Sequence, residues 1–86
     1  MGTGEDWLNG IRAALLSVSV LSGAEKAEKA VVAMAPVTAS RGLLLCGMTD
    51  IRQLEEAVGR RIYLDVGMPA GEFLILDGER LAKSTV

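Results

Sequence analysis

The sequence contains no histidine and only one cysteine, Cys46, and these two shortages remove most catalytic and metal-binding chemistry. Without histidine, the Ser–His and Cys–His pairs that activate a nucleophile cannot form. Structural zinc sites are built mainly from cysteine and histidine, so a lone thiol cannot supply one. An intrachain disulfide is excluded too. We therefore expect no metal and no cofactor.

Aromatic residues are also scarce, since Trp7, Tyr63 and Phe73 are the only three, although half of the residues are hydrophobic. The core must therefore be built from aliphatic side chains and methionine. We expect one domain over residues 1–86, and a domain this short buries only about 60% of its unfolded surface. Apolar surface should be left over, and oligomerisation or docking onto a partner protein would cover it.

Charge of one sign does not dominate, because 9 basic and 11 acidic residues give a net charge of −2. The basic stripe of a nucleic-acid binder is missing, so we do not expect nucleic acid as a partner. Glu5 and Asp6 stand where a signal peptide would carry lysine or arginine. The longest apolar run, residues 13–21, is shorter than the roughly 20 residues that span a bilayer. These features, with one reduced cysteine, predict a soluble, cytoplasmic protein that does not enter membranes.

Two helices are predicted before any strand. Apolar residues recur with the spacing of one helix face over about residues 5–21, and Leu16 and Val20 make that face unusually wide. A helix that is apolar this far round is either deeply buried or shared with another subunit. Residues 22–25 read Ser-Gly-Ala-Glu, a capping box that predicts a second helix over about 24–35, ended by Pro36.

The rest of the chain is predicted to form a small sheet. The apolar run 43–46 predicts a buried strand, residues 49–58 a helix, and residues 61–66 a half-exposed strand, which together make a βαβ unit. A strand at 73–76 leads to Asp-Gly at 77–78, a strong hairpin signal, with a return strand at 79–83. The predicted fold class is α+β. An N-terminal helical hairpin is followed by a strand–helix–strand–hairpin segment over 43–83 that forms a mixed sheet.

One motif points to catalysis. Residues 46–52 read Cys-Gly-Met-Thr-Asp-Ile-Arg, a C-x5-R spacing that directly follows the predicted strand. This is similar to the signature of cysteine-dependent phosphatases and arsenate reductases. The resemblance implies a Cys46 thiolate as nucleophile, Arg52 as the clamp on the oxyanion, and Asp65 or Asp77 as general acid.

The same motif has a structural interpretation. The resemblance covers only the motif and a strand, its loop holds a single glycine, and the chain has no Asp-Pro pair. In this interpretation, which we favour, Cys46 is a small hydrophobic residue at a strand end and Arg52 pairs with Glu56 on the following helix.

We expect a non-enzymatic protein-binding or self-assembling module, with homo-oligomerisation as one form, and the thiol enzyme as the alternative. A phage or mobile-element accessory protein is a setting that suits so small a chain. The expected contact face lies on the first helix and comprises Trp7, Leu8, Ile11, Leu15 and Val18. The competing interpretation is that these side chains pack into the core of their own chain.

Overall fold

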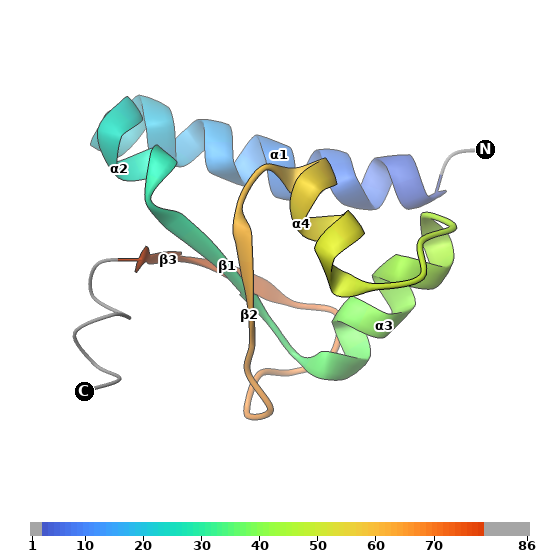
Figure 1. Ribbon diagram of the computed structural model, residues 1–86. Coiled ribbons are helices and arrows are strands. Elements are labelled where there is room, and N and C mark those ends of the chain that lie inside the picture. Colours follow the sequence, from blue (N-terminus) through green and yellow to red (C-terminus); the bar gives the residue numbers. More distant parts are fainter. Residues whose placement is uncertain (1–2, 79–86) are drawn as a thin grey trace.

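The computed structural model describes residues 3–78, beginning with the long helix α1 (Thr3–Ser22). This helix confirms the one predicted over 5–21. Glu5 and Asp6 lie in its first turn, where negative charge stabilises the N-terminal end of the helix dipole. Gly23 then adopts a φ of 93°, which allows the chain to turn back into the short helix α2 (Ala24–Glu28) against α1 (Figure 1).

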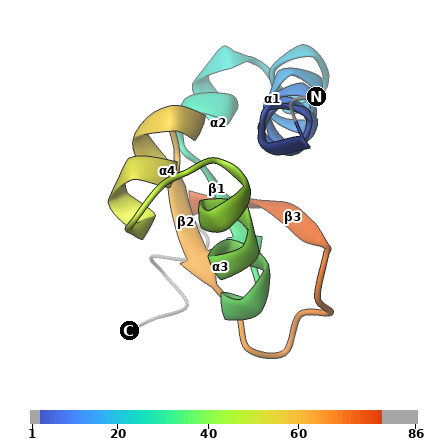
Figure 2. The ribbon, with the colours of Figure 1, turned by 90° about the vertical axis from the view of Figure 1, so that its right-hand side faces the viewer.

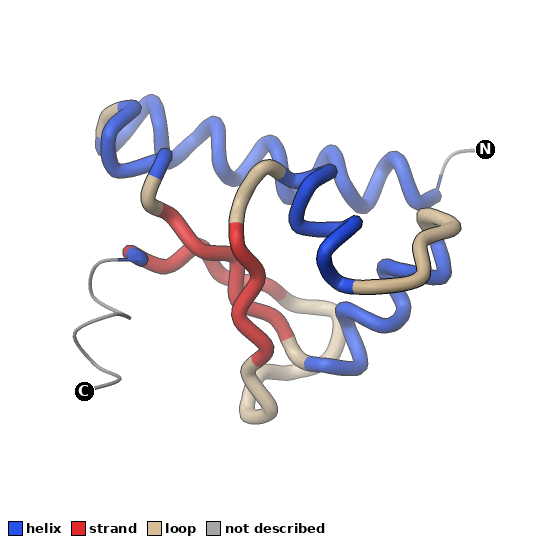
Figure 3. Tube along the Cα trace, in the orientation of Figure 1, coloured by secondary structure: helices blue, strands red, loops and turns tan. Residues whose placement is uncertain are grey.

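Three strands form a mixed sheet in the order β2-β1-β3, coloured red in Figure 3. The strands are β1 (Ala30–Met34), β2 (Arg61–Leu64) and β3 (Phe73–Asp77). β1 pairs with β2 in parallel and with β3 in antiparallel orientation. The helices α3 (Pro36–Leu45) and α4 (Ile51–Val58) make the crossover between β1 and β2. The α+β class with a small mixed sheet is therefore confirmed.

The hydrophobic core lies between one face of the sheet and the helices α1, α3 and α4, which Figure 2 shows arranged around the strands. Alternate residues of β1 point toward the helices, as the two-residue period of a strand requires. As predicted from the scarcity of aromatics, the buried side chains of the core cluster are aliphatic or methionine. They are Leu8, Ile11, Leu15, Ala30, Val32, Met34, Ala39, Leu54 and Val58. No helix among the described residues is both long and apolar enough to cross a lipid bilayer.

The helix predicted over 24–35 is wrong beyond residue 28, because residues 30–34 form the central strand. Alanine-rich composition and a capping box favoured a helix, but these signals are local. Val31 and Val32 are β-branched and fit a strand, and β1 gains hydrogen-bonded neighbours on both sides. Pro36 does not end a preceding helix but occupies the first turn of α3, where its missing N–H costs nothing.

The strand predicted at 43–46 is also wrong, since the apolar run 43–45 is the last turn of α3 and Cys46 is its C-cap. The loop expected before it is helical as well. Thr38, Ala39 and Gly42 are buried at helical spacing, whereas Leu44 is 81% exposed. The βαβ unit therefore exists, but β1 rather than residues 43–46 is its first strand.

The C-terminal half agrees better with the prediction. Asp50 caps α4, and its Oδ1 accepts a hydrogen bond of 3.1 Å from the backbone N–H of Gln53. Gly59 ends the helix in the left-handed conformation with a φ of 79°. β2 and β3 lie where strands were expected, although β2 is shorter than predicted. The return strand predicted at 79–83 lies outside the described residues.

Two helical glycines should respond oppositely to alanine. A Cβ at Gly42 would overlap the indole ring of Trp7, whereas a Cβ at Gly10 would meet nothing within 4 Å. We expect Gly42→Ala to lower the free energy of unfolding by about 1–3 kcal/mol through overpacking. Gly10→Ala should raise it by about 0.5–1 kcal/mol through better helix propensity. Urea denaturation followed by circular dichroism measures both, and stabilisation by Gly42→Ala would show that α1 does not pack on α3 there.

Candidate binding surface on helix α1

The five residues expected to form a contact face lie together on one side of α1, but that side faces the core of the same chain. Leu8, Ile11 and Leu15 are buried in the core, and Trp7 packs against it. Val18 is half-buried beside Ile75 and Leu76 of β3. The first helix thus packs on its own sheet. These side chains serve the interior, and the surface of α1 is formed by other residues.

The outer flank of α1 carries three large apolar side chains that remain in solvent. Leu16 is 66% exposed, Val20 76% and Leu21 85%. Leu16 and Val20 are spaced four residues apart, so they are neighbours on the helix surface. We call Leu16, Val20 and Leu21 the outer flank, in which Leu21 lies about 100° round the helix from Val20. In the sequence, these residues were indicated by the unusual width of the apolar face of the first helix. Periodicity alone did not show which apolar residues would be buried and which would remain exposed.

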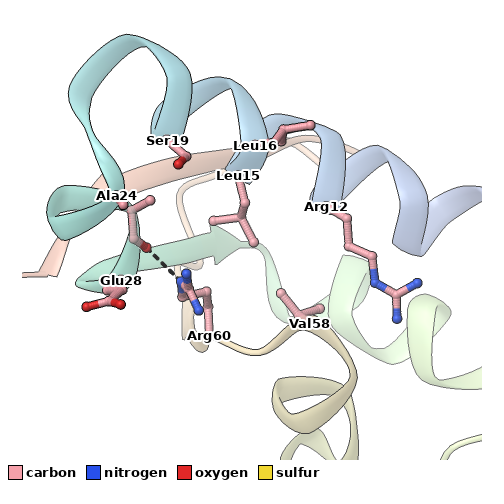
Figure 4. Close-up of a pocket in the computed structure, with 9 residues that line it drawn as sticks. Arg12, Leu15, Leu16, Ser19, Ala24, Glu28, Val58 and Arg60 are labelled. Atoms are coloured by element: carbon pink, nitrogen blue, oxygen red, sulfur yellow. Dashed lines mark hydrogen bonds between the residues drawn. The ribbon is translucent and has the colours of Figure 1, made fainter.

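A groove with a volume of about 390 Å³ opens beside this flank, between α1, α2 and the junction of α4 with β2 (Figure 4). Its apolar walls come from Leu15, Ala27 and Val58. The polar groups around it are supplied by Arg12, Ser19, Glu28 and Arg60, and Leu16 and Ala24 complete the lining. The groove therefore joins an apolar surface to two guanidinium groups.

The two arginines are held by backbone carbonyl groups near helix ends. Arg12 donates from NH2 to the carbonyl oxygen of Ala57 at 3.0 Å, in the last turn of α4. Arg60 donates from Nε to the carbonyl oxygen of Ala27 at 2.7 Å, and from NH1 to that of Gly59 at 2.6 Å. The last carbonyl groups of a helix have no partner within the helix, so these bonds satisfy them and fix the walls of the groove.

Neither Arg12 nor Arg60 forms an ion pair with a carboxylate of the described residues, in contrast to Lys29, which lies 3.9 Å from Glu25. A guanidinium group has five N–H donors, and each of these two arginines uses only some of them. Arg12 is exposed and Arg60 half-buried. The groove therefore carries two guanidinium groups and the one carboxylate of Glu28, with N–H donors left for a carboxylate brought by another molecule.

The structure does not build the anion site implied by the C-x5-R motif. That site requires a strand, a loop and a helix N-terminus, but Cys46 follows the C-terminal end of α3. The Cys46 thiol donates to the carbonyl oxygen of Gly4 at 3.6 Å, and burial raises its pKa, partly offset by the positive charge of Arg12. Arg52 is exposed on α4.

The two candidate general acids are likewise placed by local structure. Asp65 Oδ1 accepts a hydrogen bond of 2.9 Å from the backbone N–H of Gly67, which closes a turn after β2. Asp77 ends β3 opposite Ala30 of β1. The thiol, the arginine and these carboxylates therefore belong to different elements, and a raised thiol pKa opposes the thiolate that the enzyme chemistry needs.

No protein-family model matches the chain, and no curated protein or solved structure matches it either. The function of the chain is consequently inferred from the surface of α1 and the groove beside it.

The raised pKa of Cys46 predicts how its alkylation responds to pH. Burial should keep the Cys46 thiol protonated to a higher pH in the folded chain than in the unfolded chain. The alkylation rate of Cys46 should therefore reach half its maximum at a higher pH in the folded protein. By linkage, stability falls as pH rises from the unfolded to the folded pKa. Iodoacetamide labelling across pH, in buffer and in urea, measures the two midpoints. A lower midpoint in the folded protein would identify an activated thiol and restore the enzyme hypothesis.

Proposed function

We propose that this chain is a non-enzymatic protein-binding or self-assembling module that docks through the outer flank of α1. The observation that carries the proposal is the exposure of Leu16, Val20 and Leu21 on one stretch of one helix. Covering an exposed aliphatic side chain is favourable by about 1.5–3 kcal/mol, so the neighbours Leu16 and Val20 form an energetically useful anchor. Apolar anchors at helical spacing are the usual means by which a helix docks against a partner.

The rigidity of α1 supports the proposal. The inner face of the helix is fixed by Ile11 and Leu15 in the core, so its outer flank cannot rotate away from a partner. Arg12 and Arg60 hold the adjoining groove through three hydrogen bonds of 3.0 Å or less. A surface that is already arranged loses less conformational entropy on binding, which favours affinity.

The setting of this activity is part of the same proposal. A single free cysteine suits a reducing compartment, and we propose the cytoplasm. The partner would be a protein, either a further copy of the chain or a different one. A chain of 86 residues that docks onto a larger assembly also suits an accessory protein of a phage or mobile element.

Polar substitution of the outer flank should abolish binding while leaving the fold intact. We expect the double variant Leu16→Gln, Val20→Gln to lose self-association or partner capture, because its apolar anchor is removed. Both sites are exposed, so the free energy of unfolding should change by no more than about 0.5 kcal/mol. Light scattering and quantitative affinity capture, compared with the wild type, measure the loss.

The matched control is Leu44→Gln, which replaces an 81% exposed leucine on α3 rather than α1. This variant should associate as the wild type does. The proposal is overturned if the wild type is strictly monomeric and if the double variant captures every protein that the wild type captures.

A further inference from the structure

We propose that β3 is an open edge strand that pairs with β3 of a second copy of this chain, antiparallel and across a twofold axis through Ile75. The two sheets would then join into one continuous sheet. This edge is separate from the outer flank of α1, so the inference goes beyond the proposed function, and its failure would leave that function intact. It rests on the hydrogen-bonding pattern of β3, its apolar surroundings and the charges along it.

The outer edge of β3 is open. β3 lies at one margin of the sheet, and no strand among the described residues lies beyond it (Figure 2). Its pairing with β1 is continuous over residues 73–77, without a bulge. The strand contains neither proline nor lysine, and its one charged residue, Asp77, is its last. Bulges, prolines, charges and covering side chains are the features by which proteins prevent an edge strand from pairing with another chain.

The hydrogen bonds of β3 show which of its backbone groups face this open edge. The N–H of Gly78 donates to the carbonyl oxygen of Lys29, the residue before β1, at 3.0 Å. Because the direction of these groups alternates along a strand, those at positions 74 and 76 also bond to β1. The N–H and C=O groups of Phe73 and Ile75 therefore point outward, and they form no hydrogen bond with any described residue.

The opposite edge of the sheet is protected. The N–H of Ile62 on β2 donates to Oε2 of Glu55 at 2.8 Å, so a side chain of α4 occupies a position that a further strand would need. β2 has four residues against five in β3, and it begins with the charged Arg61. Pairing with a further strand is therefore directed to β3.

The side chains around the open edge are apolar. On the face of the sheet away from the helices, Leu74 is 56% exposed and Leu76 half-buried. On the helix face, Ile75 lies beside Val18 of α1. Leu21 follows Val18 by three residues, so the two are neighbours on the helix, and Leu21 is 85% exposed. A strand added to β3 would cover apolar side chains on both faces of the sheet.

β3 itself supplies a strand that fits this edge. With Ile75 on the twofold axis, Phe73 of one copy lies opposite Asp77 of the other, and Leu74 lies opposite Leu76. Every residue of β3 is then paired, and the outward N–H and C=O groups of one copy meet those of the other. A twofold contact requires a surface that is complementary to itself, and this register provides one.

The charges along β3 favour the antiparallel orientation. The two Asp77 carboxylates would lie four residues apart along the strands, or about 14 Å, which exceeds the Debye length of about 8 Å at physiological salt. The exposed Glu72 would fall opposite Gly78 and on the other face of the sheet from Asp77. In a parallel pair in register, the Asp77 side chains would instead meet at the strand spacing of about 4.8 Å, where like charges repel.

Amide hydrogen exchange measured by NMR tests whether a second copy covers this edge. One pair of strands buries less than the standard interface of about 800 Å² per partner, so we expect a dissociation constant of about micromolar or weaker. The amides of Phe73 and Ile75 should exchange at least about threefold more slowly at about 1 mM than at about 10 µM protein. The control is the amide of Leu64 on β2, whose rate should not change.

Two other outcomes of the exchange measurement contradict the inference. Fast exchange of Phe73 and Ile75 at both concentrations would show that the edge stays open. Slow exchange that is equal at both concentrations would show that the edge is covered within one chain.

Sedimentation equilibrium of two matched variants tests the same contact. Leu74 and Tyr63 lie on either side of Ala33 in the sheet, and they are 56% and 45% exposed. Leu74→Lys should raise the dimer dissociation constant at least about tenfold, because it places a charge opposite Leu76 of the second copy. Tyr63→Lys makes a comparable change beside the other edge and should leave the constant within about twofold. Urea denaturation shows that both variants remain folded, and equal effects of the two substitutions would refute the contact.

The double variant Leu16→Gln, Val20→Gln separates this inference from the proposed function. It leaves β3 unchanged, so its dimer dissociation constant should stay within about twofold of the wild-type value. If this variant is monomeric while Leu74→Lys associates as the wild type does, self-association belongs to α1, and the inference fails while the proposed function stands. If the wild type stays monomeric up to about 1 mM, the inference also fails, and capture of another protein through Leu16 and Val20 decides the proposed function.

Discussion

The central strand β1 is the element on which the rest of this structure depends. Its backbone pairs with β2 on one side and β3 on the other, and those two strands do not pair with each other. Its residues Ala30, Val32 and Met34 supply the surface against which α1 and α4 pack. Without β1 there would be no sheet and no common core. Five residues therefore connect segments from both halves of the chain.

The sequence predicted those elements whose signals are local. The apolar spacing of α1, the helix pattern over 49–58 and the apolar strand at β3 are read within short windows of the chain. Residues 29–46 were mispredicted because their structure is decided by distant partners. β1 becomes a strand by pairing with two distant segments. Val31 lies opposite Arg61 of β2, about 30 positions further along the chain, and Val32 lies opposite Ile75 of β3, about 43 positions further along.

The candidate site could likewise be predicted only in part from local sequence patterns. Periodicity identified the residues of α1 that are apolar, but it did not indicate which of them the sheet would cover. The groove combines Arg12, Ala27 and Arg60, which come from α1, α2 and the residue before β2. No local pattern brings these three together. The motif at Cys46 misled for a related reason, since its chemical meaning depends on a strand that the tertiary structure does not form.

The contact between Trp7 and Gly42 has a spectroscopic consequence. Trp7 is the only tryptophan of the chain, and its indole ring lies against the backbone of α3. Its fluorescence therefore reports the docking of the N-terminal half of α1, separately from the helix content of the molecule. Emission should shift to longer wavelength when that half of α1 lifts from α3, so the native sequence already contains an optical probe of the motion of its longest helix.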